Sequence, residues 1–582
     1  MSSCDPNPKE GEGGNTIEKD STQNQATKIV NRDFTVNIHM VGEPSNYNVV
    51  LAIDAIATAI LAPNVHMQLL ERDQQTLEFL PYLAKALPII ENKPDGTMYL
   101  TYEIRPEATW DNGTPILASD VAFSIKAIKT PTVNAASLRG YFDFVEDVII
   151  DENNNRRFTF VCNKPYFIAK DVTGSFHVLP EYFYDPQGYL AEFTVAELHD
   201  ETQQSTLLKN VKLQNFGAAF NTEFSKKAEK ISGAGAYRVA EINTNQNVVL
   251  ERKADWWGDQ VDVPYIAANP KRIVFKVIPD ENSSIAVLKD KELDVMTLIN
   301  AQKFLELKEN KMIVDDYNFH TPNTFGYYYI GMNMKNPKLE DVRVRHALSH
   351  LIDKEAVVRD LKDGFGTVTN GPVNPAKPYY DKNIPVVPFD LEAAKKLLQE
   401  AGWTDTDGNN VLDKIIDGKK TELALKIVYL QSNSFYKNLA TNFKYEAERI
   451  GVKIETRGLE RNVLTRAIEN RTYELKCLGW GGVPMPDDFT QVWHSKSMVD
   501  GSNYVGFGSP ESDQLIDQIR ITTDETERNK MYIELQKKIT EQHPYIFLFS
   551  QQSCTVINKK FTNTHVSSVR PGYLVRLFEL ND

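Results

Sequence analysis

The sequence LTYEIRPEATWDNGTPILASDVAFSIKAI, from Leu100 to Ile128, decides the fold class. Apolar and polar residues alternate from Met98 to Ile104, which predicts a strand with one buried face. The Asn-Gly pair within Asp111 to Thr114 predicts a turn. Ser119 or Asp120 is expected to cap the helix that completes the stretch. A strand, a turn and a helix in one short stretch predict α/β structure.

The same alternation of strands and helices continues outward along the chain. Asp33 to Met40 predicts a strand, whereas Asn48 to Leu61 and Asn64 to Leu70 favour helices. In the second half, Phe435 to Ile450 predicts a long amphipathic helix with one apolar stripe. Because no short repeat accompanies this alternation, the sequence predicts an α/β fold throughout.

The composition is that of a globular chain and excludes two classes of partner. Of the 582 residues, 41% are hydrophobic and 25% charged. The 65 Lys and Arg residues against 79 Asp and Glu residues give a net charge of −14. That balance argues against nucleic acid and against an anionic membrane surface as partners, since their phosphates need a basic patch. The longest apolar stretch, Val49 to Pro63, contains Asp54 and is shorter than the roughly 18 residues of a membrane-spanning helix.

The N-terminal cysteine differs from the other cysteines. Residues 1–32 are polar and are predicted to form a disordered tether. Cys4 follows two serines, as at the end of a bacterial lipobox, and is interpreted as a lipid-modified residue that anchors the chain to a membrane. An incidental cysteine in a flexible tail is the alternative. Cys162 and Cys477 lie in strand-like apolar runs and are expected to be buried.

No motif for catalysis or metal binding is complete, so we expect no enzyme, no cofactor and no metal. Phosphate-loop, metallopeptidase-helix and nucleophile-elbow patterns are all absent from the sequence. His346 and His350 have metal-ligand spacing, but a packing or surface role is the simpler interpretation. Asp405 to Asp413 has the oxygen-rich character of a calcium loop. Gly408 and Ile416 do not fit that loop, so a turn that satisfies its own backbone is expected.

Four segments, taken in order, resemble the family 5 extracellular solute-binding proteins, the oligopeptide- and dipeptide-binding components of bacterial ABC importers. They are Leu100–Ile128, Gly233–Asp259, Gly331–Val358 and Phe389–Gly408. In the first, Asn112 stands where the family usually has Asp. The resemblance covers roughly Phe34 to Phe549.

The resemblance implies a two-lobed, periplasmic-binding-protein-like clamp with an extra subdomain in the first lobe. It places the core of the first lobe at 33–65, 190–300 and 545–582, the subdomain at 66–189 and the second lobe at 301–544. Ligand would bind between the lobes, which would close on a hinge. The implied protein is a monomeric, periplasmic or extracytoplasmic lipoprotein that passes a peptide or peptide-like solute to an ABC permease.

The resemblance also implies where the second lobe contacts the ligand. In peptide-binding relatives, an Asp shortly after a Gly-Trp pair accepts the ligand's α-ammonium, because a desolvated ammonium needs a carboxylate. Here that position falls on Val483 or Gly482. Without a replacement such as Asp487 or Asp488, a free-amine peptide would lose about 2–5 kcal/mol of binding energy.

The remaining expected site residues are aromatic, small or polar. Trp480 either stacks on ligand or belongs to the core, and Gly481 with Gly482 leaves room beside it. Further expected site residues are Asp54 to Thr58 and the aromatic residues Tyr141, Phe142 and Phe144. Arg139 is expected either to pair with a ligand carboxylate or to lie on the surface. Tyr328 is expected to point to the opposite face of its strand from Tyr327 and Tyr329.

Four functions remain open at this point. The first is capture of a peptide-like solute for an importer. The second keeps the fold but binds a non-peptide ligand, such as an oligosaccharide or a metal chelate, which the uncharged Val483 favours. The third is a receptor module that reports ligand to a membrane sensor without transport. The fourth is an enzyme, for which no residue stands out.

Overall fold

The computed structural model describes residues 31–44, 46–52, 54–62, 64–224 and 227–581. Cys4 and nearly all of the predicted tether lie outside these residues, so their predicted roles stay predictions. Within the described ranges, no helix is both long enough and apolar enough to cross a bilayer.

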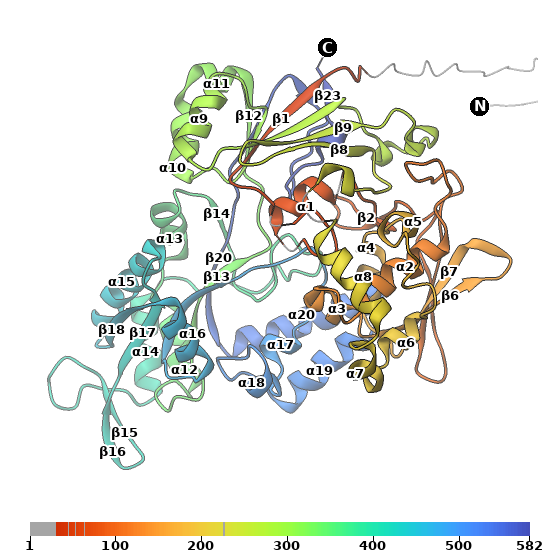
Figure 1. Cartoon of the computed structure of the whole chain (residues 1–582). Helices are drawn as coiled ribbons and strands as arrows, with labels where there is room; N and C mark the ends of the chain where they lie inside the picture. The colour runs from red at the N-terminus through yellow and green to blue at the C-terminus, as the bar shows by residue number, and fades with distance from the viewer. Residues whose placement is uncertain (1–30, 45, 53, 63, 225–226, 582) are drawn as a thin grey trace, which may run out of the picture.

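Two mixed sheets form the centres of two lobes (Figure 1). The first sheet has the order β12-β21-β11-β1-β10-β9-β8 and the second has the order β14-β20-β13-β19-β17-β18. The first comprises β1 (Thr35–Met40), β8 (Tyr237–Asn243), β9 (Asn247–Arg252), β10 (Arg272–Val277), β11 (Val295–Met296), β12 (Tyr317–His320) and β21 (Thr555–Asn558). The second comprises β13 (Tyr327–Met332), β14 (Gly366–Val368), β17 (Ala424–Leu430), β18 (Lys453–Leu459), β19 (Leu475–Trp480) and β20 (Tyr545–Gln551). The expected α/β, two-lobed architecture is therefore present.

The chain crosses between the two sheets at two short segments, 321–326 and 552–554. These segments pair with each other: the Thr324 N–H donates to the Gln551 carbonyl at 2.8 Å, and the Ser553 N–H donates to the Pro322 carbonyl at 2.8 Å. They form a two-strand connection between the lobes. Two strands lie in a different sheet from the one that the expected lobe boundaries imply. Strand β12 was expected in the second lobe (301–544) but belongs to the first sheet, and β20 was expected in the first lobe (545–582) but belongs to the second sheet.

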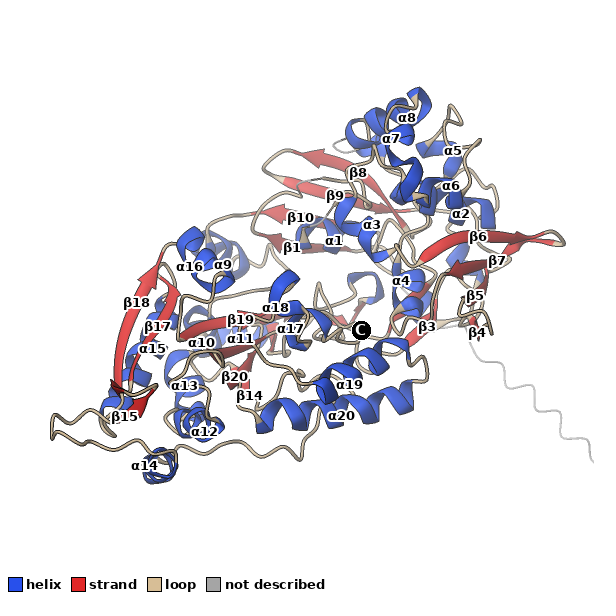
Figure 2. Ribbon diagram, turned by 90° about the horizontal axis from the view of Figure 1, so that it is seen from below, coloured by secondary structure: helices blue, strands red, loops and turns tan. Residues whose placement is uncertain are grey.

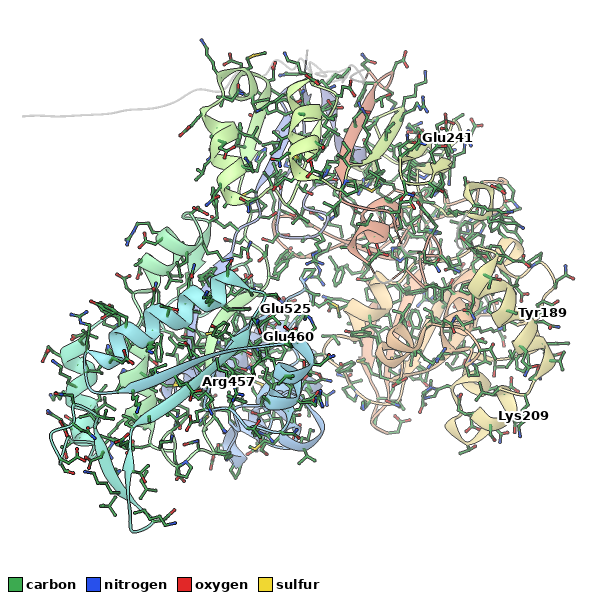
Figure 3. The ribbon with its side chains drawn as sticks, turned by 60° about the vertical axis from the view of Figure 1, so that its left-hand side comes forward. Tyr189, Lys209, Glu241, Arg457, Glu460 and Glu525 are labelled. Carbon is green, nitrogen blue, oxygen red and sulfur yellow. The ribbon has the colours of Figure 1, made fainter. Side chains whose placement is uncertain are left out.

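A separate four-stranded sheet, in the order β4-β5-β7-β6, lies within the expected subdomain at 66–189. Its strands are β4 (Ile89–Asn92), β5 (Met98–Glu103), β6 (Val145–Asp151) and β7 (Asn154–Cys162). Helices α2 (Ala118–Lys129), α3 (Ala136–Tyr141), α4 (Ala169–Ser175), α5 (Glu181–Tyr184), α6 (Val195–His199), α7 (Gln204–Leu207) and α8 (Val211–Thr222) lie beside it. In Figure 3, Tyr189 and Lys209 mark this region, whereas Arg457 and Glu460, at the end of β18, mark the second lobe across the molecule.

The remaining helices cover the two main sheets. Near the first sheet lie α1 (Ala55–Leu61), α9 (Glu281–Lys289), α10 (Ala301–Glu309) and α11 (Lys311–Asp316). The second lobe has α12 (Val342–Ser349), α13 (Lys354–Leu361), α14 (Leu391–Glu400), α15 (Ser434–Glu448), α16 (Arg461–Glu469), α17 (Thr490–Trp493), α18 (Ser497–Asp500), α19 (Pro510–Ile521) and α20 (Glu525–Glu541). In Figure 2, α19 and α20 extend toward the subdomain, and the Phe167 N–H donates to the Arg520 carbonyl there at 2.9 Å.

Two helices expected near the N-terminus are wrong in part or in whole. The segment 48–61 is helical only over α1, and 64–70 forms no helix but leads into β2 (Leu70–Arg72), which pairs with β3 (Phe79–Pro81). The reason is tertiary: the Gly235 N–H donates to the Val65 carbonyl at 2.9 Å, and the Tyr237 N–H to the Asn64 carbonyl at 3.1 Å. These bonds to a distant segment replace the bonds of a helix.

Asp120 lies inside the first turn of helix α2 and not at the expected N-cap position. Helix α2 begins at Ala118, with Leu117 as its N-cap residue and Asp120 inside the first turn. The Asp120 carboxylate accepts hydrogen bonds from the Leu117 N–H at 2.9 Å and from the Trp110 indole N–H at 3.1 Å. One buried carboxylate thus joins the turn to the start of the helix.

Replacing Asp120 by alanine is expected to lower the free energy of unfolding by about 1–3 kcal/mol, because buried N–H groups lose their acceptor. Urea unfolding of the full chain measures the change. Asp95→Ala is the matched control, since Asp95 accepts from Thr97 in an exposed turn. Equal losses in the two variants would contradict the proposed joining role of Asp120.

Candidate ligand-binding site

The loop that follows β19 is held against the segment that connects the lobes. A Cβ atom at Gly482 would lie 2.2 Å from the Phe325 carbonyl oxygen, and one at Gly326 would lie 2.5 Å from the Trp480 carbonyl oxygen. Glycine is therefore required at both positions by close backbone approach. Gly481 is exposed, and a Cβ there would meet no atom within 4 Å. The space expected beside Trp480 is open at Gly481, whereas Phe325 occupies it at Gly482.

Trp480 is half-buried at the end of β19 and rests on an aromatic stack. Its ring lies 6.4 Å from the Tyr329 ring at an interplanar angle of 15°, and Tyr329 stacks on Tyr545 at 3.8 Å. The Trp480 indole N–H donates to the Tyr545 hydroxyl oxygen at 3.3 Å. Both expected roles are thus compatible with its position, because one part of the ring is packed and another remains accessible.

Alternate residues of β13 point to opposite faces of the second sheet, as expected. Tyr327 and Tyr329 pack near Phe547, on the same side as the Trp480 stack. Tyr328 lies on the other face, 4.9 Å from the Phe549 ring and stacked on it. Tyr328 therefore belongs to the core behind the sheet.

Val483 is 57% exposed, and the two carboxylates that follow it already have partners. Asp487 lies 3.4 Å from the Lys377 ammonium and accepts from the Tyr379 hydroxyl at 3.0 Å. Asp488 lies 3.1 Å from the Arg520 guanidinium. Either residue would have to accept a ligand ammonium beside an internal cation with which it already pairs.

Lys377 is the buried centre of this region, with only 2% of its side chain exposed. Its ammonium also donates to the Met485 carbonyl and lies 5.5 Å above the Phe325 ring. Burial lowers the pKa of Lys377, although the Asp487 carboxylate opposes that shift. The sequence pattern held no signal for Lys377, which lies in an irregular loop more than 100 residues before Asp487.

Three of the first-lobe residues expected in the site, Ala57, Thr58 and Tyr141, line a cavity of about 320 Å³. Asp54 caps α1 by accepting the Ala57 N–H at 2.7 Å, and Ala57, Thr58 and Leu61 of that helix line the cavity. Tyr141, 56% exposed at the end of α3, lines it from the opposite element. The structure thus brings Tyr141 to the helix that Asp54 caps, whereas Asp54 itself is not part of the wall.

Three neighbouring residues prove to be structural. Phe142 and Phe144 are buried core residues. Arg139 donates to the carbonyl oxygens of Ile128 at 3.0 Å and Val133 at 2.7 Å. The expectation that Arg139 pairs a ligand carboxylate is therefore not supported, because its guanidinium braces the backbone between α2 and α3.

Tyr166 lies between the first-lobe segment 141–144 and the second lobe. Its ring packs on the Phe144 ring with centres 5.2 Å apart, and the Arg520 guanidinium lies 5.6 Å from the centre of the Tyr166 ring. Burial raises the pKa of Tyr166, and the Asp488 carboxylate acts in the same direction. Tyr166 had no identifying signal in the sequence.

The groups considered for metal binding are engaged elsewhere. Among the described residues, Asp405, Asp407 and Asp413 are the one group whose carboxylates approach as metal ligands would. Lys420 pairs with Asp407 at 2.7 Å and with Asp413 at 3.2 Å, and Asp405 accepts backbone N–H groups of its own turn. This is the self-satisfied turn expected from the sequence.

Histidine and cysteine side chains also follow the simpler interpretations. His346 stacks on His543 with ring centres 4.2 Å apart, and His350 bonds to the Pro388 carbonyl. Cys162 and Cys477 are buried and unpaired, as expected.

Comparisons with known proteins agree with this geometry. The model of the bacterial extracellular solute-binding proteins, family 5 Middle, matches residues 78–502. Oligopeptide-binding protein AppA of Bacillus subtilis is 26% identical over 524 residues, which cover 88% of this chain and 84% of that protein. Heme-binding protein A of Haemophilus influenzae is 24% identical over 54% of this chain and 53% of that protein. The structure of HbpA2 from Haemophilus parasuis has a TM-score of 0.74 at 19% identity, covering 94% of this chain and all of that one.

Proposed function

Because this chain belongs to the bacterial extracellular solute-binding proteins of family 5, we propose that it captures a peptide or peptide-like solute between its lobes for an ABC importer. The observation that carries the proposal is the pair of short, mutually bonded segments that alone join the two main sheets in the described chain. Such a connection allows the lobes to close over a ligand that contacts both. AppA, a relative over most of the chain, is an oligopeptide-binding protein.

We assign the ligand contacts to one wall in each lobe. Trp480, Gly481, Gly482 and Val483 form the second-lobe wall, where the exposed part of Trp480 and the open space at Gly481 favour contact with a peptide backbone. Tyr141 and the helix capped by Asp54 form the first-lobe wall. Since Asp487 and Asp488 have internal partners, the ligand is proposed to bind without a carboxylate that accepts its α-ammonium.

The wider setting follows from the same proposal. A permease in the membrane would receive the ligand, and a lipid on Cys4 would hold the monomeric protein near it. No catalytic step is proposed. We also propose the lobes expected from the sequence, with 301–320 reassigned to the first lobe and 545–551 to the second, as their sheets indicate.

Thermal unfolding of the full chain with a pool of random tri- to pentapeptides, beside the same pool N-acetylated, tests this function. Ligand at 100 times its dissociation constant stabilises a protein by about 2.7 kcal/mol. Both pools are expected to raise the unfolding temperature, because backbone contacts do not need a free amine. A shift with the free pool only would show that an α-amine acceptor exists.

The uncharged Val483 also favours a second candidate, a non-peptide ligand. That candidate predicts that neither peptide pool shifts the unfolding temperature. A haem or metal-chelate titration of the same protein would then be expected to stabilise it. No shift in any of these titrations would contradict both candidates.

A further inference from the structure

The first-lobe cavity has a composition that selects among ligand side chains. It is lined by aliphatic and aromatic residues, including Val50, Leu61, Leu138 and Phe176, with Thr58 and Ser175 as small polar groups. Among the described residues that line it, none is Asp, Glu, Lys or Arg. Burying a charge without a partner is strongly unfavourable, whereas burying apolar surface is favourable. The wall therefore discriminates against charged groups.

The one histidine of the wall keeps the cavity neutral. His177 lies with its Nε2 atom 3.3 Å from the Gln68 side-chain nitrogen, and His66 lies edge-on to it with ring centres 6.1 Å apart. Burial lowers the pKa of His177 to about 4, so its ring is uncharged at neutral pH. His177 can exchange a hydrogen bond with an occupant, but it cannot supply a charge.

The size and position of the cavity indicate what occupies it. The volume of about 320 Å³ lies at the lower end of the roughly 300–1,000 Å³ of small-molecule cavities, so the cavity can enclose one large side chain but not a whole oligopeptide. Tyr141 stands exposed at this wall. Three residues further along, Phe144 packs on Tyr166 with ring centres 5.2 Å apart, and Tyr166 lies 5.6 Å from the Arg520 guanidinium of the second lobe. The cavity thus lies on the side of the first lobe that the second lobe approaches.

We infer that this cavity is a specificity pocket that takes one large, uncharged apolar side chain of the bound solute. The inference rests on the proposed function and extends it, because it names the side-chain class that the protein prefers. Leu138 and Ala57, on opposite walls, are assigned as residues that determine this preference.

The test uses alanine pentapeptides that carry one Phe, Leu, Lys or Glu at each position in turn, with dissociation constants from calorimetry on the full chain. At one position, Phe or Leu is expected to bind at least about tenfold more tightly than Lys or Glu, since a charge would be desolvated without a partner. Equal affinity for all four side chains at every position would overturn the pocket while leaving peptide capture intact. No binding of any peptide by the folded protein would contradict the proposed function itself.

Two variants locate the preference in this cavity. Leu138→Asp places a carboxylate in the wall and is expected to reverse the preference from Phe to Lys. Thr58→Trp fills the cavity from an exposed helix position and is expected to weaken Phe binding at least about tenfold, so that the preference for Phe over Lys is lost. Leu208→Asp, at an exposed leucine outside the wall, is the matched control and is expected to keep the wild-type preference. Unchanged preference in folded Thr58→Trp would overturn the inference.

Discussion

Replacing Asp487 by alanine is expected to lower the free energy of unfolding by about 3–5 kcal/mol, because the buried Lys377 ammonium would lose its carboxylate. The Tyr379 hydroxyl, which donates to the same carboxylate at 3.0 Å, would lose its acceptor as well. The expected loss is large because Lys377 is almost fully enclosed, so that water cannot replace the missing charge. Urea unfolding followed by circular dichroism measures it.

Two further variants test whether the loss of unfolding free energy comes from this ion pair or from any change in the loop. Asp488→Ala removes a partly exposed pair with Arg520 and is expected to cost only about 1 kcal/mol. Lys377→Met in the Asp487→Ala background is expected to restore part of the lost stability, because it removes the uncompensated charge. Equal losses for Asp487→Ala and Asp488→Ala, or no recovery in the double variant, would contradict the assigned role.

The same variant bears on ligand recognition. If Asp487 serves Lys377 and not the ligand, folded Asp487→Ala protein is expected to respond equally to free and N-acetylated peptide pools, which is also the response expected of the wild type. A free-amine preference in the wild type that this variant removes would instead identify Asp487 as the missing acceptor. Stability and ligand response therefore test the two roles of one carboxylate separately.

Lowering the pH from 7.5 to 4.5 is expected to destabilise the protein by about 2–3 kcal/mol through each of two histidines. Burial, with nearby His346 and Arg345 adding to it, lowers the pKa of His543 to about 3, and burial lowers that of His177 to about 4. The unfolded chain binds these protons near pH 6.5, whereas the folded protein does not. Stability is thus complete above about pH 6.5 and is lost below it, by about 1.4 kcal/mol per pH unit for each group.

His543→Asn tests this pH dependence with a residue that can adopt the same backbone conformation. His543 has a φ of 47°, a left-handed conformation that asparagine tolerates better than most residues. The variant is expected to lose about 2–3 kcal/mol less than the wild type between pH 7.5 and 4.5 in urea unfolding. His565→Asn, at an exposed position, is the control and is expected to follow the wild type. A wild-type pH slope in His543→Asn would contradict the assignment.

Local patterns predicted the elements whose ends are set by nearby residues. Strand β5 and helix α15 lie where alternation and the apolar stripe indicated. The stretch 64–70 failed because Gly235 and Tyr237 supply its backbone bonds from a distant strand. The sequence of a short segment cannot indicate this competition, because the competing hydrogen-bond donors lie far away in the chain.

The candidate site, too, was predictable from the sequence only in part. A short motif located Trp480 and its glycine loop, and position relative to the motifs located Tyr141 and Asp54. Neither indicated that Lys377 would pair with Asp487, that Arg139 would bind backbone carbonyls, or that the Tyr166 ring would lie beside the Arg520 guanidinium. Each of these facts depends on which side chain of a given charge reaches a given partner in the packed protein.

The sequence by itself therefore determined the α/β architecture, the family and the segments that form the two walls of the candidate site. Hydrophobic periodicity, capping and turn preferences act within a few residues, so a linear pattern records them. Only the tertiary structure decided that the carboxylates after Trp480 are already paired, and that the first-lobe cavity is free of charge. Ion pairing and desolvation depend on distances between segments that lie 32 residues apart for Asp488 and Arg520 and 110 apart for Lys377 and Asp487, and packing determines those distances.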